Sequence, residues 1–253
     1  MTGNGFGIRL QWICDLIIRT DFWAGNHLGN RQYEAFRTWM IESDFIARDN
    51  AFTEVGALFS KTGINNKLFW QILWINLFLG SNLVYWYCQT AINSVSYGKS
   101  ELIELLKGDL SLRSRENAIS SLLEIFRFTP LGEMGFGKIE YMAGSKNRVA
   151  TVTKELVEFV DPALLYAFYK YADFAGNRTI VIESLFDKSD NEINLPVLLG
   201  LSKHELVKAV SKIAVLFPAL IKFDSSKTGT DVIQLREFSV AEILHKYIRG
   251  EMA

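Results

Sequence analysis

The sequence predicts a mainly α-helical protein with small β-hairpins, in which winged helix-turn-helix units flank a helical core. Apolar residues recur at helical spacing through most of the chain, and short hairpin-like segments follow helices near both ends. An uncharged apolar run occupies the centre. The expected organisation is an N-terminal winged-helix-like unit at 1–62, a helical core at 63–160 and a C-terminal winged helix-turn-helix domain at 161–253.

The N-terminal unit is expected to open with an amphipathic helix over residues 8–20, with Ile8, Trp12 and Leu16 facing inward. Asn30 can cap a second helix that ends near residue 43. Residues 45–53 then predict a small hairpin with a two-residue turn at its centre, and a short helix follows. This order of elements is that of a winged helix, with a weaker sequence signal than the C-terminal unit has.

The central core is expected from the apolar run between Leu68 and Cys88, which contains no charged residue. Its length would suffice to cross a bilayer. The Gly80-Ser81-Asn82 triplet is better explained as a turn, and amides at mid-membrane depth are costly. We therefore expect two buried helices, at 66–79 and 82–97, and no membrane partner.

The rest of the core region predicts further helices at 101–107 and 115–126, and a shorter one at 153–160. The glycine-rich stretch at 130–147 predicts a loop. A basic stretch near its end, with Lys146, Arg148 and Lys154 and no acid, could touch a phosphate backbone but is better explained as a solvated linker.

The C-terminal domain is expected to begin with a helix over 163–174, and the β-rich segment 178–182 can pair with a later hairpin. Ser202 and Glu205 match a capping box, in which each residue satisfies a free backbone N–H of the other. The helix that follows buries an apolar stripe and ends before Pro218. A hairpin with strands at 220–224 and 231–236 completes the domain.

This helix and hairpin are the predicted DNA-binding surface, because a helix with a polar basic face followed by a small wing is a common way to enter the major groove. The helix would face the groove and the wing would contact phosphates. Winged helices also serve as protein-interaction modules, so that alternative stays open. The residues assigned to duplex DNA are His204, Lys208, Ser211 and Lys212 on the helix, and Lys222 and Lys227 on the wing.

Composition limits the remaining functions. A net charge of −1 excludes a strongly basic nucleic-acid coat, so DNA binding would be local and salt-sensitive. The two cysteines, Cys14 and Cys88, and the scattered histidines give no metal-ligand spacing. No nucleophile motif stands out. We therefore expect a cytoplasmic protein that is not an enzyme, with no metal and no cofactor.

One motif nevertheless approaches a nucleotide site. Gly132 to Lys138 has the glycine and lysine spacing of a phosphate-binding P-loop, but Ile139 stands where Ser or Thr would hold magnesium. Phe126 to Thr129 is also a poor strand to precede such a loop. A flexible loop is the favoured interpretation, and nucleotide binding is the third alternative.

Several short elements are similar to those of a known family. Gly3 to Phe6 with Ile8, Arg9 and Trp12 resembles the opening of an uncharacterised bacterial domain family of DNA-phosphorothioation and phage-defence loci. The likeness continues at Leu28-Gly29-Asn30 with Ala35 and Trp39, at Thr53-Glu54 with Gly56, at Trp70 and Trp74, and at Pro130-Leu131. The family has a His-Glu-Thr-Phe element at its start, where this sequence has Asn4-Gly5-Phe6.

The resemblance implies an accessory protein of a DNA-modification or phage-defence system. Members of the family often lie beside phosphoadenosine-phosphosulfate-reductase-like sulfur-transfer proteins. The second hypothesis is therefore an adapter that recruits such a protein or an ATPase, with little or no direct DNA contact. The excess of acids over bases between Leu28 and Lys61 favours it, with Arg31, Arg37 and Glu42 as the surface. An aromatic-rich core can also hide a homodimer interface.

Overall fold

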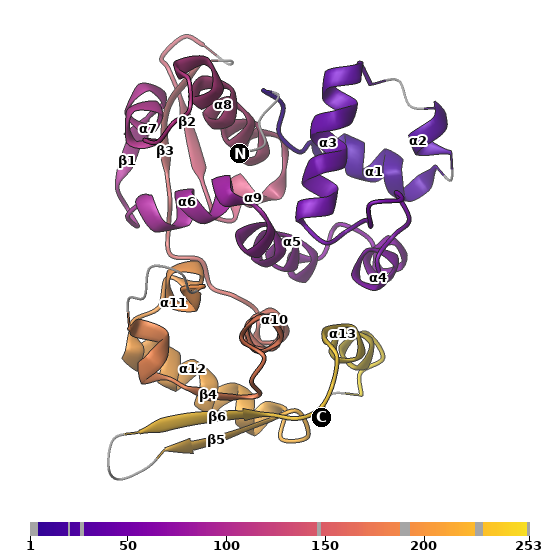
Figure 1. Cartoon of the computed structure of the whole chain (residues 1–253), viewed down its shortest axis with the longest axis vertical. Coiled ribbons are helices and arrows are strands. Elements are labelled where there is room, and N and C mark those ends of the chain that lie inside the picture. Colours follow the sequence, from indigo (N-terminus) through magenta and orange to yellow (C-terminus); the bar gives the residue numbers. More distant parts are fainter. Residues whose placement is uncertain are drawn as a thin grey trace. The chain divides into compact units, whose positions relative to one another are not determined.

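A computed structural model describes residues 5–19, 21–25, 28–145, 148–187, 193–225 and 230–251 (Figure 1). The chain forms two compact units. Unit 1 comprises Met1–Asn65 and Leu73–Val157, and unit 2 comprises Asn66–Ile72 and Glu158–Ala253. Helices dominate, with two three-stranded antiparallel sheets. The mainly helical class with small β elements is thus confirmed, whereas the division into three domains stays a prediction.

Unit 1 begins with four helices: α1 (Leu10–Ile18), α2 (Phe22–Gly25), α3 (Asn30–Glu42) and α4 (Glu54–Thr62). The inward positions expected in the first helix, Ile8, Trp12 and Leu16, are buried. Asn30 was expected to be the cap of α3, but it is the first helical residue. The cap is Gly29, whose backbone N–H donates to Gln32 Oε1 at 3.2 Å.

The hairpin expected at 45–53 is reduced to one bridge, between Ile46 and Phe52. Its turn is also longer than predicted. Ala47 N donates to Ala51 O at 2.8 Å, so three residues lie in the turn. Asn50, with φ 71°, takes the left-handed conformation that asparagine tolerates in such turns.

The central apolar run forms α5 (Lys67–Gly80) and α6 (Asn82–Thr90), and the predicted break between them is confirmed by a bend of 100°. Within the described residues, no single helix has both the length and the apolarity to cross a membrane; only this bent pair meets the criterion jointly. The amide of Asn76 is buried and donates to Ser43 O at 2.9 Å, so it has a protein partner.

Aromatic side chains from sequence-distant elements form the core of unit 1. The ring of Trp74 lies 4.9 Å from that of Phe136 and 5.7 Å from that of Phe126, between centroids. Tyr87 packs on Phe126 at 5.2 Å and donates its hydroxyl to Phe136 O at 3.0 Å. A buried tyrosine hydroxyl needs such a partner.

The second half of unit 1 departs from the sequence prediction. The helix expected at 82–97 ends at Thr90, and a three-stranded sheet in the order β1-β3-β2 stands where a loop and a helix were predicted. Residues 154–160 are not helical. The elements are β1 (Ser96–Gly98), α7 (Lys99–Leu105), α8 (Leu112–Phe128), α9 (Pro130–Glu133), β2 (Lys138–Tyr141) and β3 (Val149–Thr153).

These predictions were wrong because the three strands are short and lack an apolar alternation. Thr153, expected to begin a helix, instead pairs with Ser96 on one side and Lys138 on the other. The run Val149–Thr153 contains four β-branched residues, which is the signal that favours a strand.

Unit 2 contains α10 (Asp161–Ala175), β4 (Thr179–Val181), a 3-10 turn η1 (Glu183–Phe186), α11 (Leu195–Leu199), α12 (Lys203–Leu216), β5 (Ile221–Ser225), β6 (Asp231–Leu235) and α13 (Val240–Ile248). Its sheet has the order β4-β6-β5, so the predicted pairing of segment 178–182 with the hairpin is confirmed. Tyr169 of the buried helix α10 donates its hydroxyl to Leu220 O at 2.7 Å and fastens the helix to the start of β5.

Candidate nucleic-acid interface

Helix α12 begins where the capping box predicts. Glu205 N donates to Ser202 Oγ at 3.4 Å, and Ser202 N donates to Glu205 Oε2 at 2.8 Å. Hydrogen bonds from the Ser202 hydroxyl and backbone N–H hold the pKa of the Glu205 carboxyl below its ordinary value, because they stabilise the charged form. Leu206, Val210 and Ile213 are buried against unit 2. The opposite face is therefore fixed toward solvent.

The predicted contact residues of α12 lie on that solvent face. His204, Lys208 and Lys212 are exposed. Ser211 is half-buried, and its hydroxyl donates to Val207 O at 2.8 Å, so its hydrogen is already used within the helix. Val215 continues the same face with 79% exposure. The helix thus changes along its length from a polar, basic start to an apolar end.

Carboxylates neutralise two of the predicted lysines. Lys212 Nζ lies 2.8 Å from Asp161 Oδ1, and Lys222 Nζ lies 2.7 Å from Asp224 Oδ2. Among the described residues, the structure gives neither Lys208 nor His204 a side-chain hydrogen bond or ion pair. Of the predicted lysines that the structure describes, Lys208 is therefore the one with its charge most available to a ligand.

The segments predicted to form the wing are β5 and β6, which pair from Ile221–Leu235 to Ser225–Asp231. Lys222 is exposed on β5. Ser225 Oγ donates to Asp231 Oδ1 at 2.7 Å near the end of the pairing. Lys227, assigned to phosphate contact, lies outside the described residues.

Another lysine, Lys203, stands at the first position of α12 and was not assigned to the site. Its Nζ lies 2.6 Å from Glu183 Oε1. The hydrogen bond from Lys203 lowers the pKa of Glu183, and the same bond raises the pKa of Lys203. The lysine at the start of α12 is therefore also neutralised by a carboxylate, that of Glu183.

The Gly132–Lys138 segment does not have the geometry of a P-loop. Gly132 belongs to α9, and Lys138 begins strand β2 rather than a helix. A P-loop needs a helix N-terminus to face the phosphates, and here none follows. Lys138 Nζ instead lies 3.2 Å from Glu155 Oε1. The nucleotide alternative at this segment is therefore dropped.

The basic stretch around residues 143–154 likewise does not act as one surface. Lys154 is partly buried, and its ammonium donates to Cys88 O at 3.0 Å and to Ala91 O at 3.3 Å. Burial lowers the pKa of Lys154. Arg148 is exposed and faces a cavity of unit 1, and Lys146 lies outside the described residues.

Comparison of the whole chain with solved structures shows a known fold. The crystal structure of magnesium ion-bound SspB superposes with a TM-score of 0.69, over 98% of this chain and 87% of that chain, at 12% sequence identity. The chain shares the fold of SspB. The sequence matches no family model and no curated protein.

Because that SspB structure is magnesium-bound, the ligands available in this chain bear on whether it could hold the same ion. Within the described residues, no group of three or more His, Cys, Asp or Glu side chains is arranged to hold a metal ion. The charged groups of the candidate interface are its lysines and its histidine.

Proposed function

We propose that this chain is a non-enzymatic accessory protein of a bacterial DNA-phosphorothioation or related phage-defence system, and that it contacts duplex DNA through α12. The shared fold with SspB, a phosphorothioation-associated protein, supports the link to such systems. It agrees with the family resemblance of the sequence. The DNA contact rests on the local geometry of unit 2.

The observation that carries the DNA contact is the order of elements around α12. A helix, a strand, two helices joined by a tight turn and a hairpin follow one another, as in a winged helix-turn-helix. The turn between α11 and α12 has three residues, 200–202. It starts at Gly200, whose φ of 67° is a left-handed conformation that glycine adopts without cost.

In this arrangement α12 would be the recognition helix, whose first turns reach the base edges. His204 and Lys208 occupy those turns and are exposed. The lysines held by carboxylates can exchange that partner for a phosphate, because an exposed ion pair contributes only about 0–1 kcal/mol. The chain's small net charge then predicts weak binding that falls steeply with salt.

The test is fluorescence anisotropy of labelled duplex DNA, with and without phosphorothioate links, at two salt concentrations. Lys208→Glu should weaken binding by roughly five- to tenfold at low salt and reduce the salt slope by about one. Lys61→Glu, which makes the same charge change on an exposed residue of α4, is the control and should have little effect. Equal losses in both variants would contradict the placement on α12.

The adapter hypothesis also has a specific observation in its favour. The end of α12 exposes apolar surface: Val215 is 79% and Leu216 is 42% exposed. Exposed apolar groups that adjoin one another are typical of protein contacts. A sulfur-transfer protein or an ATPase of the same locus would be the partner, or a second copy of this chain.

Val215→Ser, which removes the apolar side chain without adding a charge to the face proposed for DNA, distinguishes the two functions. If the adapter function holds, this variant loses a partner that copurifies with the wild-type chain, or it dissociates a homodimer in sedimentation velocity. Its DNA affinity should stay unchanged. Retention of every partner by the variant would count against this apolar surface.

A further inference from the structure

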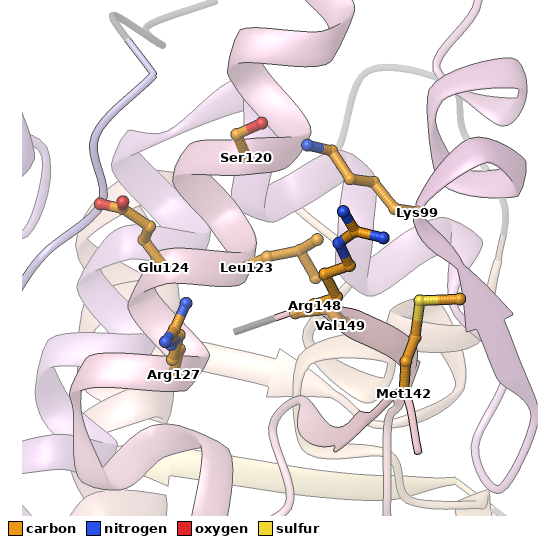
Figure 2. Close-up of a pocket in the computed structure, with 8 residues that line it drawn as sticks. All are labelled: Lys99, Ser120, Leu123, Glu124, Arg127, Met142, Arg148 and Val149. Atoms are coloured by element: carbon orange, nitrogen blue, oxygen red, sulfur yellow. The ribbon is translucent and has the colours of Figure 1, made fainter. Parts of the chain in front are cut away.

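Unit 1 contains a cavity of about 410 Å³ beside α8, far along the sequence from the winged-helix elements (Figure 2). Small-molecule sites have volumes of about 300–1,000 Å³, so the cavity is large enough for a compact metabolite. Its apolar lining residues are Leu123 of α8, Met142 and Val149 of β3. The cavity does not include Gly132 to Lys138.

Three cationic side chains from three separate elements line this cavity: Lys99 of α7, Arg127 of α8 and Arg148 before β3. Figure 2 shows the ends of Lys99 and Arg148 pointing into the same space above Leu123. Within the described residues, neither of these two charges has an ion pair. Like charges that converge without a carboxylate are stabilised when an anion lies between them.

The acid in the lining does not fill this role. Glu124 turns its carboxylate toward the N-terminal segment, where Oε1 lies 3.1 Å from Arg9 Nη2 and Oε2 accepts a hydrogen bond from Gly7 N at 3.1 Å. Arg9 therefore neutralises the Glu124 carboxylate, and the lining of the cavity has a net positive charge.

Helix stability does not explain the position of Lys99 either. Lys99 is the first residue of α7, where the partial positive charge of the helix end disfavours a cation. Glu101, two residues later, is the residue that completes the cap, with its carboxylate accepting from Gly98 N at 2.5 Å. The capping of α7 therefore does not account for the charge of Lys99.

We propose that this cavity binds a small molecule that carries a phosphate group, of the mononucleotide class. The phosphate lies between the Lys99 ammonium and the Arg148 guanidinium, since a guanidinium binds phosphate oxygens with two parallel hydrogen bonds. The organic part packs on Leu123, Val149 and Met142. This site is in unit 1 and goes beyond the DNA contact proposed for α12.

The test is isothermal titration of the full chain with AMP, and with adenosine as the ligand that lacks the phosphate. AMP should bind and adenosine should not. The double variant Lys99→Ala/Arg148→Ala should weaken AMP binding by about tenfold or more. Lys107→Ala/Arg113→Ala, which removes two exposed cations of the same unit, should leave AMP binding unchanged.

Four results would overturn the proposal. The first is that AMP does not bind at millimolar concentration, and the second is that AMP and adenosine bind with equal affinity. The third is that the two double variants bind AMP equally well. The fourth is that Lys99→Ala/Arg148→Ala loses duplex-DNA binding while AMP does not compete with DNA. The last would assign the cavity to the DNA backbone. A thermal-melting curve checks that the variants fold, and Lys99→Ala should not lower the melting temperature. Because AMP binding is measured without DNA, its failure is separate from failure of the α12 proposal.

Discussion

The ammonium of Lys212 lies 2.8 Å from the carboxylate of Asp161, so the first residue of α10 neutralises a lysine predicted to reach DNA. The two residues are 51 positions apart in the sequence. An ion pair of this kind competes with a phosphate for the same ammonium. If α12 binds DNA as proposed, Asp161 therefore lowers the contribution of Lys212 to that binding.

Asp161→Asn should raise the affinity for duplex DNA by roughly two- to fivefold at low salt, because it removes the competing charge. Anisotropy titration measures the change. Asp109→Asn makes the same change in net charge on an exposed residue of unit 1 and serves as the control. An equal rise in both variants would show a general charge effect rather than the release of Lys212.

Glu205 gives a pH-dependent contribution to stability. Hydrogen bonds from Ser202 hold its pKa below the ordinary 4.5 in the folded chain. A lowered folded pKa contributes stability that is present above pH 4.5 and is lost as the pH falls through the folded value. Glu205→Gln should therefore melt with a flatter pH dependence below about pH 4.5 than wild type. Glu104→Gln, an exposed position of α7, should keep the wild-type profile.

The two cysteines should differ in reactivity. Burial raises the pKa of the Cys88 thiol to about 12, whereas Cys14 is half-buried and its pKa is raised less. Thiolate is the reactive form, so Cys88 should resist a disulfide reagent at pH 8. In Cys14→Ser, labelling should be absent in the native protein and reach one thiol per chain in guanidinium. Rapid native labelling of that variant would show that Cys88 is accessible.

The elements that could be predicted are those whose signal is local. The capping box of Ser202 and Glu205, the buried stripe of α12 and the break at Gly80-Ser81-Asn82 were all visible in a few consecutive residues. The sheet of unit 1 was not, because β1 at residue 96 becomes a strand only by pairing with residues near 153. Its stability comes from partners that periodicity does not show.

The residues that carry the family resemblance are largely packing residues. Trp39 is buried and donates its Nε1–H to Phe6 O at 2.9 Å. Arg9 lies over the rings of Trp12 and Phe128, at 4.9 and 4.7 Å, and bonds Glu124. These contacts hold the N-terminal segment against α3 and α8. The resemblance therefore predicts the fold better than it predicts a site.

The candidate sites could be predicted only in part for the same reason. The exposed face of α12 follows from helical spacing. The partners of the predicted lysines do not: Lys212 is neutralised by Asp161 of another helix, and Lys222 is neutralised by Asp224 once both lie on strand β5. Lys99 and Arg148 are 49 positions apart by their numbers and share a cavity only because α7 packs against β3 in unit 1. No local pattern places them together.

Gly137 tests whether the glycines of the 132–138 segment serve packing or a ligand. A Cβ at Gly137 would lie 2.3 Å from Cδ2 of the Phe126 ring. Gly137→Ala should therefore lower the free energy of unfolding by about 1–3 kcal/mol through overpacking, measured by urea denaturation. In a double-mutant cycle, Phe126→Leu should absorb part of this loss, because it removes the ring that clashes. If the losses in unfolding free energy of the two single variants add in the double variant, the Phe126 ring is not the cause of the strain. If Gly137→Ala alone leaves the stability unchanged, the ring moves aside.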